Sequence, residues 1–224
     1  MPPDITYERP IVTVDIVLMT IREGRLAVAL IERETEPFNG VAALIGGYIR
    51  TDEDADAEAA VRRILRTKAG LEGFYFEQLR TFARKDRDPR GWSVSIAYFA
   101  LVPQHALIGE GGTKLLLRPA DNPGQLPFDH GEIVAAARRR LRGKGAYSSM
   151  VARLLPDVFT MSELQTAYET VLGERLDQSA FRRKMNDLNV LEEIPGEKRQ
   201  TQQARRPTTL YRLKNEPTVF DRRI

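Results

Sequence analysis

The order of predicted secondary structure changes once along this chain, near residue 143, and that change constrains the fold more than any single motif. Before it, strands and helices are mixed. The β-branched, apolar run at 11–19 predicts a central strand, and 26–31 predicts its hairpin partner. Further strands are expected at 74–84 and 93–102, with helices at 54–68 and 133–142. This order predicts an α+β domain.

After residue 143 the expected elements are helices at 147–155, 161–172 and 178–188, then short strands at 190–194 and 208–213. Helices followed by a two-stranded hairpin are the order of a winged helix-turn-helix. The two glycines within 142–145 predict a short linker. The sequence therefore predicts two domains, 1–143 and 144–224.

Polar residues and glycines mark the ends of these helices. Asp52 is expected to cap the helix at 54–68, and Gly70 is expected to end it. Thr160 and Glu163 form a capping box, which satisfies the first backbone N–H groups of the following helix. Gly173 is expected at the end of that helix, where a left-handed residue is common.

Composition excludes several classes of protein. The chain has no cysteine, which excludes disulfides, thiolate zinc sites and a cysteine nucleophile. Its two histidines, His105 and His130, are too few for a histidine-rich metal site. No apolar run is long enough to span a bilayer, and the first residues lack the regions of a signal peptide. We therefore expect a cytoplasmic protein with no membrane partner.

Positive charge is concentrated towards the end of the chain. Between residues 133 and 155 there are six basic residues and no acidic one. Between 178 and 214 there are nine basic and four acidic residues, an excess of five. The first half of the chain has no such imbalance. A basic block confined to one end favours a polyanionic partner for that end.

The segment after the first hairpin resembles the signature of Nudix hydrolases, G-x5-E-x7-R-E-U-x-E-E-x-G-U. Gly47 is followed after five residues by Glu53, and 63–71 overlays the second half of the signature. In that family the glutamates hold Mg²⁺ against a nucleoside diphosphate. The alternative is that Gly46 and Gly47 form an ordinary turn before an amphipathic helix, with 52–54 as its solvated acidic start.

The departures from that signature predict that the metal site is lost. Ile64, Thr67 and Lys68 stand where the resemblance requires glutamates, and the segment from Gly47 to Gly70 is two residues too long. Mg²⁺ needs hard oxygen ligands, which isoleucine and lysine cannot supply. We expect a retained fold with no catalytic residue, no metal and no required cofactor.

Arginines at strand ends and nearby aromatic rings suit a nucleotide diphosphate. Arginine forks match phosphate oxygens, and aromatic rings stack on a base. The predicted ligand-binding residues are Arg33, Gly46, Gly47, Arg80, Phe82, Arg87, Arg90 and Phe128, with Trp92 as a further stacking ring. The alternative is that each arginine is a solvated surface group and that Phe82 and Phe128 belong to the core.

The helix at 178–188 fixes its own orientation through its apolar residues. Phe181, Met185 and Leu188 recur at helical spacing and are expected to pack inwards. Arginine and asparagine on the opposite face suit the major groove of DNA, and a basic hairpin tip suits the minor groove or phosphates. The predicted DNA-binding residues are Gln178, Ser179, Arg182, Arg183, Asn186, Lys198, Arg199, Arg205, Arg206 and Thr208. The alternative for this helix is a solvated basic face.

Several separate segments, in order, resemble the Nudix-related transcriptional regulators of NAD metabolism, the NrtR family. These segments are 77–82, 87–95, 126–130, 159–165 and 176–185. The resemblance implies a Nudix-like α/β/α sandwich followed by a winged helix-turn-helix. It also implies a homodimeric repressor that binds palindromic double-stranded operator DNA and responds to ADP-ribose or a related nucleotide effector. The family has asparagine where this chain has Ala180.

Two other functions stay open from the sequence. Glu53, Asp54 and Glu58 could rebuild a metal site, which would make the chain an active Nudix hydrolase of ADP-ribose-type substrates with an accessory nucleic-acid-binding domain. The basic end could instead bind RNA beside a nucleotide-binding scaffold.

Overall fold

Strand β1 (Ile11–Arg22) is the centre of the larger sheet because both of its faces are apolar. This is a computed structural model that describes residues 9–107, 114–199, 207–214 and 217–224. β1 pairs in parallel with β6 (Ser93–Leu101) and antiparallel with β2 (Arg25–Glu32). The seven-stranded sheet also contains β3 (Ala42–Ala43), β4 (Ile45–Tyr48), β5 (Tyr75–Arg84) and β7 (Leu116–Pro119), and its main path is β3-β2-β1-β6-β5.

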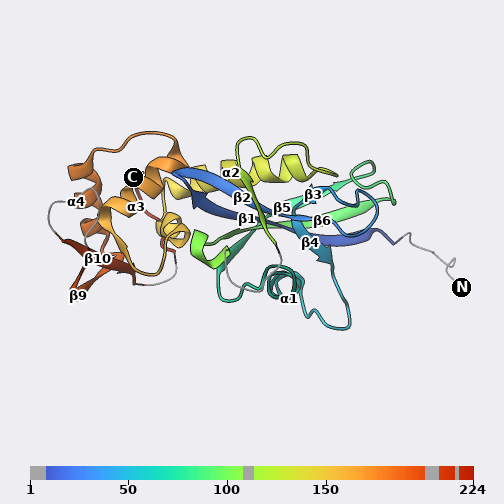
Figure 1. Cartoon of the computed structure of the whole chain (residues 1–224), viewed down its shortest axis with the longest axis horizontal. Helices are drawn as coiled ribbons and strands as arrows, with labels where there is room; N and C mark the ends of the chain where they lie inside the picture. The colour runs from blue at the N-terminus through green and yellow to red at the C-terminus, as the bar shows by residue number, and fades with distance from the viewer. Residues whose placement is uncertain (1–8, 108–113, 200–206, 215–216) are drawn as a thin grey trace, which may run out of the picture.

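Helices cover both faces of this sheet, α1 (Ala57–Ala69) on one and α2 (His130–Gly145) on the other (Figure 1). Successive side chains of a strand point to opposite faces. Ile16 and Leu18 therefore belong to the apolar cluster that includes α1, whereas Val17 and Met19 belong to the cluster that includes α2. The predicted α/β/α sandwich is confirmed.

Helix α1 begins later than the sequence predicted. Asp56, not Asp52, is its N-cap, and the Asp56 carboxylate accepts the Ala59 N–H at 2.7 Å. The preceding residues are held in a turn, where the Asp54 N–H donates to the Arg50 carbonyl at 2.7 Å. Gly70 ends the helix in the left-handed conformation with φ of 65°, as predicted.

The predicted linker at 142–145 is wrong, because these residues form the last turn of α2. A Cβ added at Gly145 would lie 2.9 Å from Val151 Cγ2 and 3.4 Å from Val171 Cγ1. The glycine therefore permits close packing of α2 against its neighbours rather than flexibility. The helix predicted at 147–155 is a shorter 3₁₀ helix, η2 (Ser149–Leu154). A second 3₁₀ helix, η1 (Gln104–Leu107), follows β6.

The last third of the chain has the elements of a winged helix. Helices α3 (Met161–Leu172) and α4 (Gln178–Leu188) precede a three-stranded sheet of β8 (Phe159–Thr160), β10 (Thr208–Leu213) and β9 (Leu191–Arg199). The predicted capping box of Thr160 and Glu163 is present, and the rings of Tyr168 and Phe181 meet edge to face at 5.4 Å. Strand β9 is longer than the predicted 190–194 and runs through Arg199.

One apolar cluster runs through both parts of the chain. It includes Phe99 of the larger sheet, Leu141 of α2, Met150 of η2, Leu164 of α3 and Met185 of α4. Helix α2 and the helices of the winged helix therefore share one packed interior. No helix within the described residues is both long and apolar enough to cross a membrane.

The segment 217–224 ties α4 to the end of α2, a contact that the sequence did not predict. The Ile224 N–H donates to the Ala146 carbonyl at 2.8 Å, and Lys184 Nζ donates to the Arg222 carbonyl at 2.7 Å. Phe220 is 5% exposed and belongs to the shared apolar cluster.

Phe220→Ala is expected to lower the free energy of unfolding by about 3 kcal/mol, because it leaves a cavity under the C-terminal segment. Val219→Ala is the matched control, since Val219 is 66% exposed. Urea denaturation followed by circular dichroism measures both variants. Equal decreases in the free energy of unfolding for Phe220→Ala and Val219→Ala would show that the segment 217–224 does not contribute to the core.

Candidate functional site

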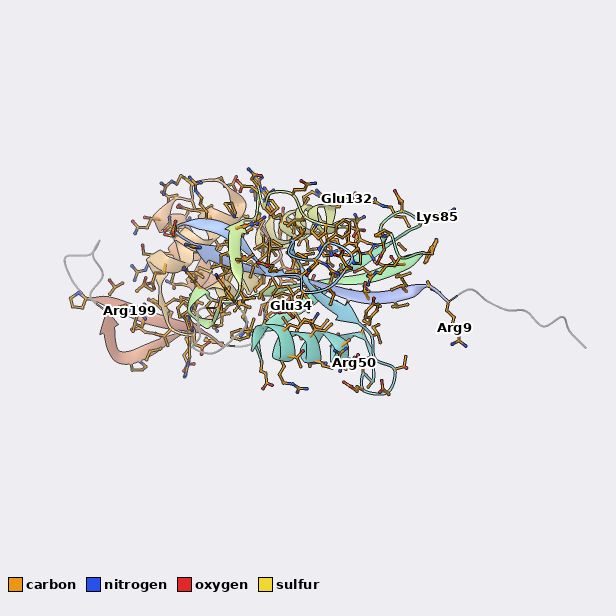
Figure 2. The ribbon with its side chains drawn as sticks, turned by 45° about the vertical axis from the view of Figure 1, so that its right-hand side comes forward. Arg9, Glu34, Arg50, Lys85, Glu132 and Arg199 are labelled. Carbon is orange, nitrogen blue, oxygen red and sulfur yellow. The ribbon has the colours of Figure 1, made fainter. Side chains whose placement is uncertain are left out.

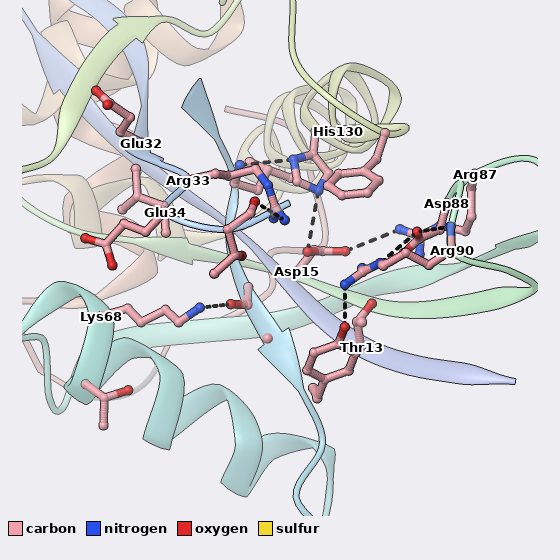
Figure 3. A pocket seen from close by; sticks show the side chains of 18 residues that line it. Thr13, Asp15, Glu32, Arg33, Glu34, Lys68, Arg87, Asp88, Arg90 and His130 are labelled. Atoms are coloured by element: carbon pink, nitrogen blue, oxygen red, sulfur yellow. Dashed lines mark hydrogen bonds and ion pairs between the residues drawn. The ribbon is translucent and has the colours of Figure 1, made fainter. Parts of the chain in front are cut away.

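A cavity of about 370 Å³ opens between β1, β4, the last turn of α1 and the start of α2. Figure 3 shows its wall. Its lining includes charged, aromatic and small residues: Asp15, Glu32, Arg33, Glu34, Gly46, Gly47, Tyr48, Thr67, Lys68, Arg87, Asp88, Arg90, Phe128 and His130. Six of the predicted ligand-binding residues therefore meet here: Arg33, Gly46, Gly47, Arg87, Arg90 and Phe128.

Gly46 brings β4 close to β1 at the floor of the cavity. It pairs with Asp15, and a Cβ added at this position would lie 2.3 Å from Asp15 Oδ1 and 2.7 Å from the Val14 carbonyl oxygen. No side chain fits at that distance. Gly46 and Gly47 are thus strand residues of β4, and the alternative that they form an ordinary turn before the helix is wrong.

A buried charge network forms the back of the cavity, and the sequence analysis missed its centre, Asp15. Asp15 Oδ2 accepts from Ser95 Oγ at 2.6 Å and from Arg87 Nη2 at 3.3 Å. Burial by itself raises the pKa of Asp15, but the polar contacts of His130 and Ser95 and the charge of Arg87 lower it to about 2. One feature of the sequence could have identified Asp15: it is the only carboxylate inside the apolar run at 11–19.

Arg87 holds this network together and is not a free fork for a ligand. Its guanidinium donates twice to Asp129, at 2.9 and 3.0 Å, once to Ser93 Oγ at 3.1 Å and once to Asp15. Four of its five N–H groups are therefore engaged within the protein. The predicted ligand contact at Arg87 is corrected to a structural role in the cavity wall, because the side chain is only 5% exposed.

His130 lines the cavity without acting as a free base. The Leu44 N–H donates to His130 Nδ1 at 3.1 Å, so the ring proton is assigned to Nε2. Nε2 lies 3.6 Å from Asp15 Oδ1. Both ring nitrogens therefore face protein groups.

Arg33, Arg90 and Phe128 form one wall together. The Arg33 and Arg90 guanidinium carbons lie 5.0 and 5.8 Å from the centre of the Phe128 ring. Arg90 is paired with Asp88 at 2.6 Å and also hydrogen bonds to the Tyr48 hydroxyl. Phe128 has a left-handed φ of 55°, an uncommon conformation for a bulky residue that places its ring at the cavity.

Arg80 and Phe82 are not brought to this cavity. Phe82 is 6% exposed and packs in the apolar cluster that includes α2. The Arg80 guanidinium lies 4.2 Å from the centre of the Phe82 ring. Trp92 is 47% exposed and is also absent from the lining. Strand alternation sends Phe82 to the α2 face, so the prediction that Phe82 lines this cavity is not supported. Trp92 lies in the bend before β6.

Of the three positions on α1 where the Nudix signature has glutamates, Thr67 and Lys68 line the cavity. Ile64 is fully buried, and Thr67 Oγ1 donates to the Arg63 carbonyl at 2.8 Å. Lys68 Nζ donates to the Gly46 carbonyl at 2.7 Å. The side chains at these three positions are therefore an apolar group, a hydrogen-bonded hydroxyl and a cation.

The acidic residues that could rebuild a metal site are held by arginines. Glu53 pairs with Arg50 at 2.9 Å, Asp54 with Arg63 at 2.7 Å, and Glu58 with Arg62 at 2.9 Å. Within the described residues, no three histidine, aspartate or glutamate side chains are grouped as a metal ion would require.

The outer face of α4 is exposed, as predicted. Phe181 and Met185 are buried, whereas the predicted DNA contacts on this helix, Gln178, Ser179, Arg182, Arg183 and Asn186, are all exposed. Among the described residues, Arg182 and Arg183 form no ion pair. Ala180, where the resemblance expected asparagine, is exposed on the same helix.

The DNA-binding residues predicted in the β9–β10 hairpin differ in what the structure shows for them. Arg199 lies at the end of the molecule opposite Arg9 (Figure 2) and donates to Glu163 at 3.2 Å and to the Val158 carbonyl at 3.2 Å. Its guanidinium is therefore engaged within the protein, and the prediction of a free contact at Arg199 is not supported. Lys198 pairs through its backbone with Thr209, and Thr208 pairs with Arg199. Arg205 and Arg206 lie outside the described residues.

Comparison with known proteins agrees with this architecture. Residues 151–213 match the model of the NrtR DNA-binding winged helix domain. A protein of Acinetobacter baylyi described as "ADPR responsive transcriptional repressor NtrR" is 36% identical over 92% of this chain and 83% of its own length. The chain belongs to the NrtR family.

Solved structures of this family have the same fold. Shewanella oneidensis NrtR in complex with a 27mer DNA is 34% identical, with a TM-score of 0.86 over 95% of this chain and 99% of that one. The NUDIX domain of the same protein in complex with ADP ribose is also 34% identical, with a TM-score of 0.54 over 60% of this chain and 90% of that one. The predicted Nudix-like sandwich with a C-terminal winged helix is thus confirmed.

A Nudix enzyme is also similar to the first part of the chain. An ADP-ribose pyrophosphatase of Methanocaldococcus jannaschii is 31% identical over 57% of this chain and 73% of its own length.

Asp15→Asn is expected to lower the free energy of unfolding at neutral pH by on the order of 2 kcal/mol, because Arg87 loses a charged partner. The pKa of Asp15 in the folded protein, about 2, lies below its ordinary value of 3.8. The contribution of the Asp15 carboxylate to stability is therefore fully present above the pKa of Asp15 in the unfolded chain. It is lost as the pH falls from about 4 to about 2.

Urea denaturation across this pH range measures the difference in the free energy of unfolding between wild type and Asp15→Asn. This difference should become smaller as the pH falls. Asp121→Asn, an exposed position, serves as the control and should show no such change. A difference that stays constant with pH would contradict the assigned charge network.

Proposed function

We propose that this chain is a DNA-binding transcriptional repressor of NAD-metabolism genes that responds to ADP-ribose or a related NAD-derived nucleotide. Residues 1–143 would bind the nucleotide, and residues 144–224 would bind palindromic operator DNA as a cytoplasmic homodimer. The observation that carries this proposal is the extended similarity to the Acinetobacter repressor, which covers both the cavity and the winged helix.

The cavity wall has the chemistry that a diphosphate between two sugars requires. Arg33 and Lys68 line it and form no ion pair among the described residues, which leaves their charge available to phosphate oxygens. Glu32 and Glu34 lie on the opposite side from Asp88 and Arg90 in Figure 3. Their carboxylates suit ribose hydroxyls, which donate hydrogen bonds. Phe128 supplies an aromatic ring to the wall beside Arg33 and Arg90, where a base could pack.

The winged helix has the chemistry that duplex DNA requires. In a helix-turn-helix the second helix reads the major groove, and α4 is that helix here. Its exposed Arg182 and Arg183 suit guanine edges or phosphates, and Asn186 suits adenine. A homodimer would place two such helices on the two halves of a palindromic site.

Helix α2 is a physical connection between the two sites. His130, its first residue, lines the cavity, and Gly145, its last residue, packs against Val151 and Val171. A helix of 16 residues spans about 24 Å. A ligand that favours one position of α2 would change the position of the winged helix, provided that it binds the two states with different affinity.

The alternative function is hydrolysis of ADP-ribose, which the similarity to the Methanocaldococcus pyrophosphatase favours. Three observations oppose it: the side chains at the Nudix positions, the arginine partners of Glu53, Asp54 and Glu58, and the engaged ring of His130. We propose that the chain is not an enzyme and requires no cofactor.

The double variant Arg182→Ala, Arg183→Ala is expected to weaken binding to duplex DNA by about tenfold or more and to reduce its dependence on salt, since each arginine is a contact to DNA. A gel shift with a palindromic duplex from an NAD-biosynthesis promoter, titrated with ADP-ribose, measures affinity and ligand response together. Arg62→Ala on α1 is the control. Binding that no NAD-related metabolite changes would contradict the proposed sensing function.

Incubation of the full chain with ADP-ribose and either Mg²⁺ or Mn²⁺ is expected to release no AMP, because Glu53, Asp54 and Glu58 are paired with arginines and Lys68 replaces a glutamate of the Nudix signature. Liquid chromatography detects AMP directly, and an active Nudix ADP-ribose pyrophosphatase provides the positive control. Metal-dependent AMP formation by this chain would establish the alternative function.

A further inference from the structure

Lys68 stands where the Nudix signature has its last glutamate, and its ammonium group is part of the cavity wall. It extends from the last turn of α1 towards β4, where Nζ donates to the Gly46 carbonyl at 2.7 Å (Figure 3). An ammonium group has three N–H donors. Two of them remain for a ligand in the cavity.

The residues around Lys68 do not fit the divalent cation that Nudix enzymes hold. A metal ion needs several oxygen ligands, but Ile64 is buried carbon and the Thr67 hydroxyl is bonded to the helix backbone. The Gly46 carbonyl oxygen already accepts from an ammonium group, whose positive charge repels a second cation.

Some of the cationic side chains in the cavity wall are paired with carboxylates and others are not. Arg87 is paired with Asp129 and Asp15, and Arg90 is paired with Asp88.

Arg33 and Lys68, by contrast, have no carboxylate within ion-pair distance among the described residues. Partial burial and repulsion by the charge of Arg33 lower the pKa of Lys68, whereas the charges of Asp15 and Glu34 act in the opposite direction. An anion placed between them would relieve that repulsion.

We propose that Lys68, together with Arg33, binds the diphosphate of the nucleotide in place of a divalent cation, an inference that rests on the proposed function. Arg33 uses Nε and one Nη2 hydrogen for the Pro37 and Thr35 carbonyls, so three of its five N–H groups are available. Two unpaired positive charges match the two negative charges of a diphosphate diester. The chain therefore binds its ligand without metal.

Isothermal titration calorimetry of the full chain with ADP-ribose, in EDTA and in Mg²⁺, tests this proposal. Wild type is expected to bind with the same affinity in both buffers. Lys68→Met, which keeps the length of the side chain but removes its charge, is expected to weaken binding by about tenfold to a hundredfold. Lys68→Arg should retain most of the affinity, and Lys68→Glu should bind more weakly than Lys68→Met.

Arg66→Met is the matched control, because Arg66 is an exposed cation on the same helix that does not line the cavity. It should bind ADP-ribose as wild type does. Thermal unfolding without ligand checks that every variant is folded.

Wild-type binding that disappears in EDTA would overturn the inference and leave the proposed function intact. Unchanged affinity of folded Lys68→Met in EDTA would likewise overturn the role of Lys68. An absence of ADP-ribose binding in both buffers would overturn the proposed nucleotide response itself.

Discussion

The burial of one carboxylate, Asp15, in the centre of β1 determines how the first part of the chain is assembled. A buried charge is tolerated only when it is paired and hydrogen bonded. Ser95 of β6, Arg87 of the turn after β5 and His130 at the start of α2 supply these contacts. The network thereby fixes two strands, one turn and one helix around the same point, and the cavity opens beside it.

The same network explains why the arginines of the site have different roles. Arg87 and Arg90 are paired with carboxylates and shape the wall, whereas Arg33 and Lys68 form no ion pair among the residues that the structure describes. A Nudix hydrolase needs carboxylates on α1 that are free to bind metal, but Glu53, Asp54 and Glu58 are paired with arginines. On α1, Lys68 stands where the Nudix signature has a glutamate, so the same position carries a cation in place of a carboxylate.

Close packing links this site to the DNA-binding surface. The glycine near the end of α2 lets η2 and α3 approach the helix, and one apolar cluster continues from the larger sheet to α4. Packed interiors transmit displacement because they contain little free volume. The segment 217–224 forms hydrogen bonds both to Lys184 of α4 and to Ala146 at the end of α2, so it connects these two helices in addition to their packing.

The sequence by itself determined the elements whose signals are local: the apolar run of β1, the capping box of α3 and the inward row of α4. Family resemblance in separate segments was enough to predict the two domains and their order. Tertiary structure decided what depends on partners distant in sequence. In the folded chain Arg87 pairs with Asp129, Arg199 pairs with Glu163, and Arg80 packs on Phe82 outside the cavity. The residues predicted as a linker are the last turn of α2. A charge or a glycine has no fixed role until the fold supplies its neighbours, because its energy depends on burial and pairing.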